Sequence, residues 1–467
     1  MGRRRPLLTL PRNEILPMIG PIYSRLMFSM AAIAFCLSLA STPVTAQSNR
    51  PWSDTRQGDT QKNDASPRDT QNDTQQIQAS KPEEAPAPPD FGPQTAQATA
   101  EAARRYAEIA ASGGWPRIAK PVGPAAKGKP VVDLRRRLAT ENFLAREDAD
   151  APVWDAKLTD ALKRFQSHVG LKETGTISPA TLRELNVPAA ERAHALGATA
   201  ERLSKVKFGF GERYVDVNIP AAEVESVENG RRIESYTAVV GGPKNPSPQI
   251  TAKIFSVLIN PAWTVPASIV KRDLAPALRR NPNYLTRQNI RVLDGRGREI
   301  DLRHLRGLSV ERVAMFTFRQ DPGPKNSLGS IHLDMPNKDE VYMHDTPHKD
   351  LFERDYRFLS HGCVRVEGIY DLATWLLQEP GQPGQWDRAA LRSKVDEGKT
   401  ETIKLKRPTP VAWVYMTGWA SPDGATYFRH DIYNLDKGVA LPAAAGALQK
   451  TVAPAQRGAS PRARLRR

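Results

Sequence analysis

The sequence predicts a multidomain protein, in which a small all-α domain of three helices precedes a mixed, β-rich domain that carries an inserted helical segment. Three observations support this fold class. Apolar residues recur at helical spacing between residues 131 and 190, whereas short alternating or β-branched runs bounded by turn residues follow from Tyr214 onward. A chain of 467 residues is also long enough for two or three domains of ordinary size.

Composition excludes several classes of protein. No second apolar run reaches the length of a membrane span, which excludes a polytopic membrane protein. Two cysteines are too few for a disulfide framework or a cysteine-rich zinc site. The net charge is +16, and residues 439–467 carry six basic and no acidic residues. We expect residues 436–467 to form a basic, disordered tail in solvent; the charge of such a tail alone would also allow contact with nucleic acid, anionic lipid or an anionic wall polymer. For the protein as a whole we expect no nucleic-acid partner.

The N-terminal region has the pattern of an export signal. Five arginines precede the apolar run Leu26–Ala40, and small residues at Val44 and Ala46 fit a cleavage site. We expect residues 1–46 to be a cleaved signal peptide; the alternative is an uncut membrane anchor, for which 15 apolar residues are few. Residues 47–98 are rich in Asp, Thr, Gln, Ser and Pro and are predicted to be a disordered tether.

Helical periodicity follows the tether. Residues 99–130 are predicted to be a helical segment and a linker, because a helical pattern ends at Gly113-Gly114-Trp115-Pro116. Within residues 131–190, Leu158, Leu162 and Phe165 lie on one face of a helix. Ser178 followed by Pro179 predicts the start of another helix, with the serine as its N-cap. Residues 191–212 are predicted to be a connecting helix.

The β-rich domain is predicted to span residues 213–435. Its expected strands include residues 214–219, 236–240 and 254–260, and further short runs at 314–318, 341–344 and 412–417. A helical stretch and a polar loop interrupt this pattern at about residues 266–305. An insertion of this kind within a β domain predicts a mobile lid over a functional site.

One cysteine and two histidines lie close together near the end of this domain. Removal of the signal peptide takes away Cys36, so Cys363 is the single cysteine of the mature chain, either inert and buried or reactive. His344 and His361 precede it, and Gly362 permits close approach of a backbone N–H. Cysteine catalysis needs such a thiol, a base and oxyanion donors. From these residues alone, a buried cysteine beside two surface histidines is an equal alternative.

The spacing of these residues adds a resemblance. His344, fifteen further residues and then Ser-His-Gly-Cys-Val-Arg at 360–365 resemble the signature of the L,D-transpeptidase catalytic domain, the YkuD/ErfK family. The flanking segments 260–266 and 319–329 agree with it. Residues 132–138, 162–166 and 181–187 resemble a three-helix peptidoglycan-binding domain. Together with Gly113-Gly114-Trp115-Pro116, that domain resembles the large YcbB-type branch of the family.

The resemblance implies roles for individual residues. Cys363 matches the nucleophile and His344 the general base and acid. The backbone carbonyl of Asp345 matches the group that orients the base, and the N–H groups of Gly362 and Cys363 match the oxyanion hole. Substrate-binding or supporting roles fall to four further residues: Ser360, His361, Arg365 and Trp263.

The resemblance also implies a reaction in the periplasm. Cys363 attacks a tetrapeptide stem at diaminopimelate, D-Ala leaves, and an amine of another stem resolves the thioester into a 3→3 peptidoglycan crosslink. No metal and no cofactor are required, and carbapenem-type inhibitors are expected to acylate the thiol. The alternatives are an L,D-carboxypeptidase, attachment of an outer-membrane protein to peptidoglycan, and a non-catalytic wall-binding protein. A papain-like protease is disfavoured because the matched base precedes the cysteine in the chain.

Overall fold

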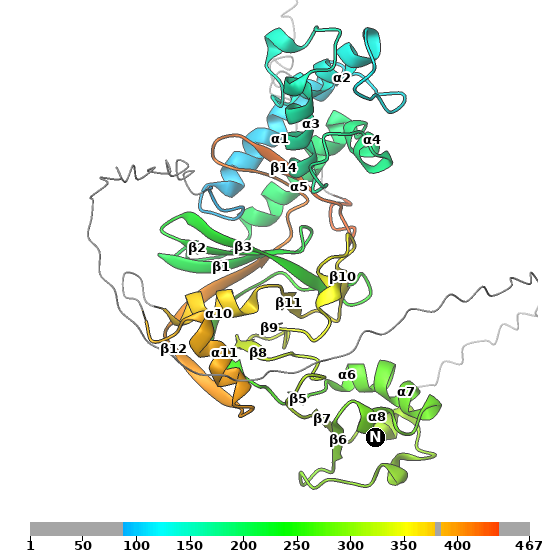
Figure 1. Ribbon diagram of the computed structural model, residues 1–467, viewed down its shortest axis with the longest axis vertical. Helices are drawn as coiled ribbons and strands as arrows, with labels where there is room; N and C mark the ends of the chain where they lie inside the picture. Colours follow the sequence, from blue (N-terminus) through cyan, green and yellow to red (C-terminus); the bar gives the residue numbers. More distant parts are fainter. Residues whose placement is uncertain (1–86, 379–383, 439–467) are drawn as a thin grey trace, which may run out of the picture. The chain divides into compact units, whose positions relative to one another are not determined.

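The computed structural model describes residues 87–378 and 384–438 (Figure 1). The predicted signal peptide, most of the predicted tether and the tail from residue 439 lie outside the described residues. The predicted tether boundary at residue 98 is wrong. Phe91 is buried against Phe208 and Phe210, and helix α1 begins at Thr95, so the fold starts before residue 98. Among the described residues, no helix has the length and apolar character needed to cross a membrane.

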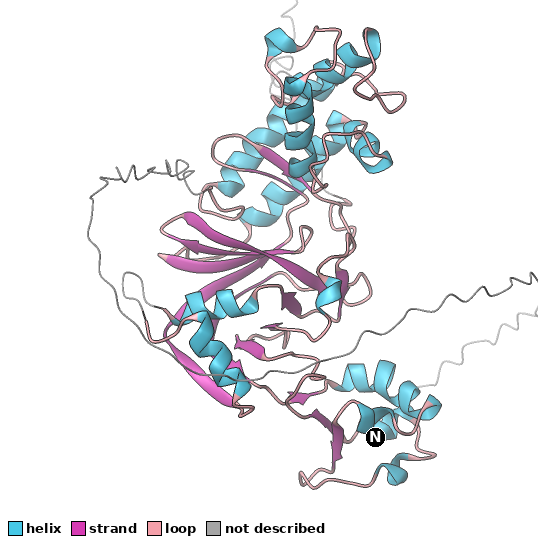
Figure 2. Cartoon of the chain, in the orientation of Figure 1, coloured by secondary structure: helices cyan, strands magenta, loops and turns pink. Residues whose placement is uncertain are grey.

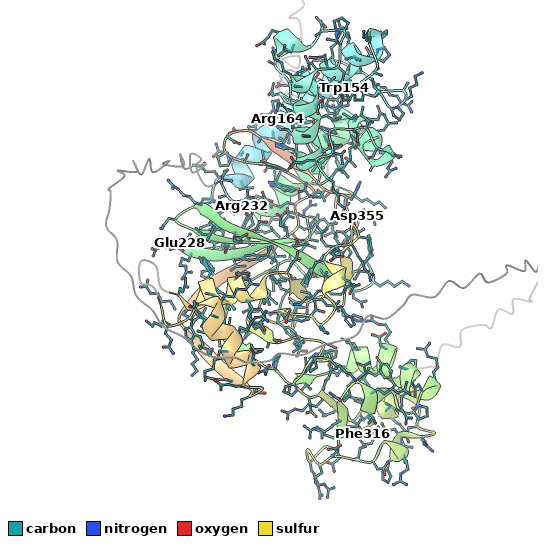
Figure 3. The ribbon with its side chains drawn as sticks, viewed as in Figure 1. Trp154, Arg164, Glu228, Arg232, Phe316 and Asp355 are labelled. Carbon is teal, nitrogen blue, oxygen red and sulfur yellow. The ribbon has the colours of Figure 1, made fainter. Side chains whose placement is uncertain are left out.

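Three helices form the helical module, which we define as residues 129–185: α2 (Lys129–Thr140), α3 (Ala156–His168) and α4 (Pro179–Leu185), with the short η1 (Arg146–Asp148) between the first two. Leucines and Phe165 fill a core of its own. The Ser178 side chain accepts from the N–H of Thr181, so the predicted N-cap is confirmed. Trp154 and Arg164 are labelled in this module in Figure 3.

Two longer helices flank the module in the sequence, α1 (Thr95–Ala111) and α5 (Ala189–Ser204). They pack on each other and on a hairpin formed by β13 (Gly418–Ala420) and β14 (Thr426–Phe428). Module residue His168 stacks its ring on Tyr427 at 4.3 Å and contacts the carbonyl of Thr426 through Nδ1 at 2.8 Å. These contacts hold the helical module against the β13–β14 hairpin.

A nine-stranded mixed sheet forms the centre of the β-rich domain, with strand order β10-β3-β11-β9-β8-β4-β12-β1-β2 (Figure 2). The strands are β1 (Arg213–Asn218), β2 (Glu223–Glu228), β3 (Arg231–Gly241), β4 (Ile250–Ile259), β8 (Ile331–Asp334), β9 (Met343–His344), β10 (Phe358–Ser360), β11 (Val364–Val366) and β12 (Glu401–Val414).

Alternating apolar residues of these strands build the main core, which also takes in α10 (Ile369–Leu377) and α11 (Arg388–Asp396). The short strands β9 and β11 lie side by side near the middle of the sheet and pair in parallel, with Val364 opposite Met343 and Arg365 opposite His344. This register brings two segments about twenty residues apart in the sequence into contact, and both carry predicted site residues. The single-turn η4 (Lys349–Leu351) lies between them in the chain.

The predicted insertion is a small subdomain with its own sheet and core. It contains β5 (Trp263–Thr264), α6 (Ala267–Ile269), the π-helical η2 (Val270–Leu274), α7 (Ala275–Arg280), α8 (Tyr284–Arg287), β6 (Ile290–Leu293), η3 (Leu302–Leu305), α9 (Val310–Val313) and β7 (Thr317–Gln320).

The strands of this subdomain pair in the order β5-β7-β6, and a separate apolar cluster lies between them and the helices. One prediction is therefore wrong: the insertion does not end at about residue 305 but extends to β7, which pairs with β5 and β6. Of the strand predicted at residues 314–318, only residues 317 and 318 belong to β7, because α9 ends at Val313 and a turn follows it. Strands this short leave little signal in the sequence. Phe316, labelled in Figure 3, lies in this subdomain and packs against its core.

Candidate active site

Cys363 opens into a cavity of about 380 Å³. The main sheet supplies one part of the wall, with Tyr342, His344 and Arg365 beside the cysteine. The insertion supplies another part through residues of β5, α6, η2 and α8. Residues of the insertion thus share this cavity with the cysteine, while its action as a mobile lid stays a prediction.

The thiol of Cys363 is held neutral. Burial raises its pKa to about 11, and hydrogen bonds from the backbone and hydroxyl of Tyr342 together with the charge of Arg365 oppose that rise. The hydroxyl of Tyr342 itself accepts a hydrogen bond from Trp263 Nε1 at 3.1 Å, which leaves its own proton to donate. The sulfur therefore has a built-in hydrogen-bond donor that would favour its thiolate form.

His344 is a neutral base with a fixed tautomer. Its Nδ1 lies 2.5 Å from the backbone carbonyl of Asp345. A carbonyl only accepts, so Nδ1 carries the proton and Nε2 is the basic nitrogen. Burial, then the charges of Arg365 and His332, lowers the pKa of His344 to about 3, against the opposing effect of the Asp345 and Leu328 carbonyls.

The side chain of Asp345 performs a different task from its carbonyl. The carboxylate accepts from the N–H of Ser330 at 3.0 Å and pairs with Lys349. Gly329 makes room for it: a Cβ there would lie 2.5 Å from the Asp345 side chain, and the glycine φ of +63° disfavours other residues. The carbonyl of Asp345 contacts His344 Nδ1, while its orienting role stays a prediction, and the carboxylate anchors the strand end.

A network of serines fixes the loop before the nucleophile. Ser360 Oγ donates to the carbonyl of Cys363 at 2.5 Å and accepts from the N–H of Gly362 at 3.2 Å. Ser247 Oγ donates to the carbonyl of Gly362 at 2.7 Å. Ser360 thus bonds to the backbone at two points of the loop, and its predicted supporting role stays a prediction. The oxyanion role predicted for the Gly362 N–H is not met in this arrangement, because that N–H is already bonded to Ser360.

Arg365 and Trp263 both line the cavity. Arg365 lies opposite His344 across the β9–β11 pair, and its Nε has no hydrogen-bond partner among the described residues. A largely buried cation with an unused donor suits a substrate carboxylate or a developing negative charge. Trp263 is a wall of the cavity, as predicted, and also the hydrogen-bond donor to Tyr342.

Four residues of this site were not identified from the sequence. Tyr342 contacts the sulfur, Ser247 holds the loop, His332 faces His344 across the β8–β9 pair, and Asp273 of the insertion lies 2.9 Å from Nε2 of His361. Tyr342 lies two residues before His344 and directly before β9, so its spacing from His344 was a usable signal for it. The others depend on pairings between distant segments.

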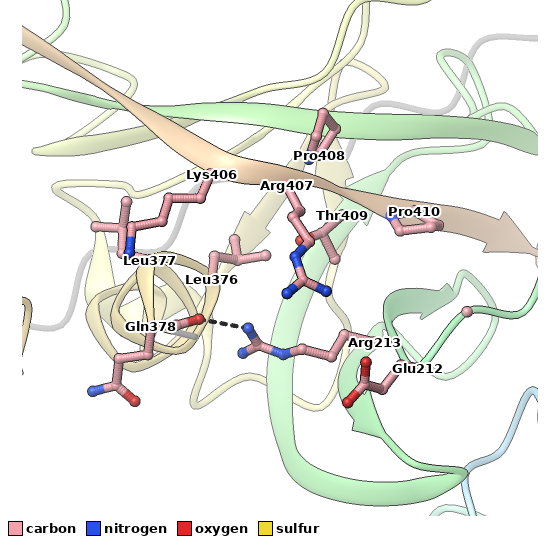
Figure 4. A pocket seen from close by; sticks show the side chains of 11 residues that line it. Glu212, Arg213, Leu376, Leu377, Gln378, Lys406, Arg407, Pro408, Thr409 and Pro410 are labelled. Carbon is pink, nitrogen blue, oxygen red and sulfur yellow. Dashed lines mark hydrogen bonds between the residues drawn. The ribbon is translucent and has the colours of Figure 1, made fainter. Parts of the chain in front are cut away.

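Other features of the described residues do not compete with this site. No group of three or more Asp, Glu, His and Cys side chains in residues 87–378 and 384–438 is arranged to hold a metal ion. A second cavity of about 210 Å³ lies between the end of α10 and β12 (Figure 4). There Arg213 donates to the carbonyl of Gln378 at 2.6 Å. Its lining includes no Cys, His or Ser, so it lacks the residue types that the sequence predicted for catalysis.

Comparison with known proteins agrees with this geometry. Residues 212–412 match the YkuD family, described as an L,D-transpeptidase catalytic domain. Residues 127–185, which include the helical module, match the family described as a "Putative peptidoglycan binding domain". The predicted multidomain arrangement, with a peptidoglycan-binding helical domain before a β-rich YkuD domain, is therefore confirmed.

A protein of Haemophilus influenzae described as "Putative L,D-transpeptidase" is 32% identical over 225 residues. That match covers 48% of this chain and 45% of the relative, so the chain spans less than half of the relative's length. Among solved structures, an L,D-transpeptidase from Stackebrandtia nassauensis is 14% identical with a TM-score of 0.24, covering 63% of this chain and 97% of that chain. L,D-transpeptidase 3 from Mycobacterium tuberculosis, solved with a faropenem-derived adduct, is 10% identical with a TM-score of 0.22, covering 44% and 60%. The assignment of the site rests on the family match and on the geometry above.

Proposed function

We propose that this protein is a peptidoglycan L,D-transpeptidase that forms 3→3 crosslinks through an acyl-enzyme on Cys363. The observation that carries the proposal is the placement of Cys363, the neutral imidazole of His344 and the cation of Arg365 around one cavity in a YkuD-family domain. The substrate would be the stem peptides of peptidoglycan, with a tetrapeptide as donor and the diaminopimelate amine of another stem as acceptor.

In the first step, the sulfur of Cys363 attacks the carbonyl carbon between diaminopimelate and the terminal D-Ala. The thiol proton passes to Nε2 of His344, since Nδ1 is already protonated and bonded to Asp345. The carbon–nitrogen bond then breaks, and the same proton moves from His344 to the leaving amine of D-Ala. A thioester remains on Cys363 and the imidazole is neutral again.

In the second step, the acceptor amine attacks the thioester carbon. The amine loses a proton to His344 as the new amide forms, and the carbon–sulfur bond breaks. The proton returns to the sulfur, which restores the neutral thiol. After the two steps, Cys363 and His344 are again in their starting protonation states. The proposed reaction requires no metal and no cofactor.

Two groups are placed to stabilise the oxyanion of each step. The N–H of Cys363 adjoins the attacking sulfur, and the Tyr342 hydroxyl lies against that sulfur with a proton to donate. An oxyanion donor of this kind contributes about 3–4 kcal/mol to the transition state. We assign this role to the Cys363 N–H and to Tyr342, with Gly362 joining only if its bond to Ser360 opens.

The neutral states of both reacting groups fit this mechanism. A pKa of about 11 for Cys363 and about 3 for His344 means that the thiolate–imidazolium pair is scarce at pH 7. Proton transfer therefore accompanies attack on the carbonyl instead of preceding it. A substrate carboxylate that pairs with Arg365 would weaken the effect of that cation on His344 and raise the pKa of the base.

The other parts of the chain support a role at the cell wall. We propose that residues 1–46 export the protein to the periplasm and that the helical module binds peptidoglycan, so that a second weak contact raises the local concentration of stems at Cys363. Carbapenem-type β-lactams should acylate Cys363, because they present a reactive carbonyl to the same thiol.

Analysis of muropeptides from wall material incubated with the purified protein tests this proposal. New 3→3 dimers with release of D-Ala are expected. Tripeptide stems without dimers would indicate an L,D-carboxypeptidase, and covalent attachment of an outer-membrane protein would indicate a protein acceptor. Wall material that is unchanged would indicate a protein that only binds.

A further inference from the structure

A hydrogen-bond contact between His361 and Asp273 ties the catalytic loop to the insertion. Nε2 of His361 lies 2.9 Å from Oδ2 of Asp273. His361 is two residues before the nucleophile, whereas Asp273 lies in the five-residue π-helical η2 of the insertion. A π-helical turn inside a helix is frequently found at functional sites. The insertion thus contacts the chain directly next to Gly362 and Cys363.

A second contact joins the neighbouring insertion residue to the other side of the same loop. Nη1 of Arg272 donates to Oδ1 of Asn245 at 2.5 Å. Asn245 belongs to the turn that also carries Ser247, and Ser247 Oγ donates to the carbonyl of Gly362. The backbone of this turn also bonds to β10, because the N–H of Gly242 donates to the carbonyl of Ser360 at 3.1 Å.

Two adjacent insertion residues therefore hold both segments that set the conformation of the nucleophile. Asp273 contacts the catalytic loop itself, and Arg272 contacts the turn that supports it. The same helical segment lines the cavity into which Cys363 opens. Movement of the insertion relative to the sheet would accordingly change the loop that presents the sulfur and its N–H.

We propose that Asp273 is a positioning residue, which acts through His361 to fix the catalytic loop when the insertion lies against the site. This inference rests on the proposed function, because it concerns the acylation of Cys363. The insertion would then do more than cover the substrate: its docked position and the reactive geometry of the nucleophile would form together.

The energetics separate this role from a purely structural one. The side chains of His361 and Asp273 are 36% and 44% exposed, and Arg272 Nε is a further neighbour of Asp273 at 3.4 Å. Exposed ion pairs stabilise a fold by only about 0–1 kcal/mol. Loss of the pair should therefore hardly alter the melting temperature but should slow the covalent step.

The experiment compares Asp273→Asn with a matched control, Glu299→Gln, in the full chain. Glu299 is also an exposed acid of the insertion, 3.7 Å from Arg291, and does not line the cavity. Acylation by imipenem is followed by intact-protein mass spectrometry over a range of concentrations. This separates the first-order rate of acylation from the concentration at half-maximal rate.

For Asp273→Asn we expect the first-order rate to fall on the order of tenfold, below the 10²-fold that a misplacement of 1 Å can cost, with the half-maximal concentration unchanged. The exchanged pair, Asp273→His with His361→Asp, should recover part of the rate. Glu299→Gln should match the wild type.

An unchanged rate in Asp273→Asn would overturn the inference, and so would a change confined to the half-maximal concentration, which would mean that the insertion only holds ligand. A slower first-order rate that comes with a clear drop in melting temperature, and that the exchanged pair does not recover, would also overturn it. A wild type that imipenem does not acylate at Cys363 would instead overturn the proposed function, so the two failures are distinct.

Discussion

The helical module and the catalytic domain differ in how far apart in the chain their interacting residues lie. In the module, the N-cap of α4 joins Ser178 to Thr181, and the core leucines lie on helices linked by short connections. In the active site, Trp263, Tyr342 and Cys363 come from three separate segments and meet only because β9 and β11 pair in one register. Local changes should therefore damage the module without touching the chemistry, whereas small changes near β9 and β11 should affect the chemistry strongly.

The largest effect on acylation should come from His344→Ala, which removes the proposed base from the active site. Acylation of Cys363 by a carbapenem should fall by about 10²–10⁴, the usual contribution of a general base. Sedimentation with insoluble peptidoglycan should not change, because the module has its own core. Time courses of adduct formation and a pelleting assay measure the two properties on the same preparation.

His348→Ala is the matched control for that variant. His348 is exposed, lies four residues further along the chain and does not line the cavity, so this variant should be acylated at the wild-type rate. A folded His361→Ala variant that lost more activity than His344→Ala would contradict the assignment of the base.

The converse change is Leu158→Ala in the module. Leu158 is fully buried in the module core, and truncation of such a leucine costs about 2–5 kcal/mol of stability. We expect the unfolding transition of the module to shift to lower denaturant concentration while the acylation rate of the native protein stays unchanged. A parallel loss of acylation under native conditions would show that the two regions do not behave separately.

Tyr342→Phe tests whether the Tyr342 hydroxyl acts on the thiol of Cys363. Its hydroxyl lowers the pKa of Cys363, so removal of the hydroxyl should raise that pKa further above about 11. A hydrogen bond to a charged group contributes about 1.5–3 kcal/mol, so acylation at pH 7 should fall by about 10-fold to 10²-fold.

The pH dependence of acylation tests which protonation state of the thiol reacts. General-base attack uses the neutral thiol and the neutral imidazole, and pKa values of about 11 for Cys363 and about 3 for His344 keep both groups neutral between pH 6 and pH 10. The wild-type rate should therefore be nearly constant over this range, and the Tyr342→Phe rate should be equally flat but lower. Acylation rates measured from pH 6 to pH 10 provide both curves. Coincident curves would mean that the hydroxyl does not act on the sulfur.

The smallest effect should come from the contact between the two regions, tested by His168→Ala. This change removes the stack on Tyr427 and the bond to the Thr426 carbonyl. Such contacts contribute about 1–2 kcal/mol together. Calorimetry should show a small drop in melting temperature and a weaker coupling between module and hairpin, with acylation unaffected. A large loss of acylation would mean that the module helps to form the active site.

The same contrast explains what the sequence could predict. Helices α3 and α4 follow from the spacing of their leucines and from Ser178, because these signals are local. The motif predicted Cys363 and His344 for the same reason. The positions of Ser247 and Asp273 could not be predicted, since each depends on a turn or a subdomain docking against a distant loop. Arg137 shows the limit in the module: its charge favours solvent, yet it lies on the same face of α2 as Leu134, is fully buried, pairs with Glu141 and stacks on Trp115.

The central claim is that Cys363 alone carries the acyl group. The most direct measurement is peptide mapping by mass spectrometry of the purified protein after incubation with imipenem, alongside the Cys363→Ala variant. We expect one adduct on the peptide that contains Cys363 and none on the Cys363→Ala variant. An adduct on another residue, or equal labelling of a folded Cys363→Ala protein, would contradict it.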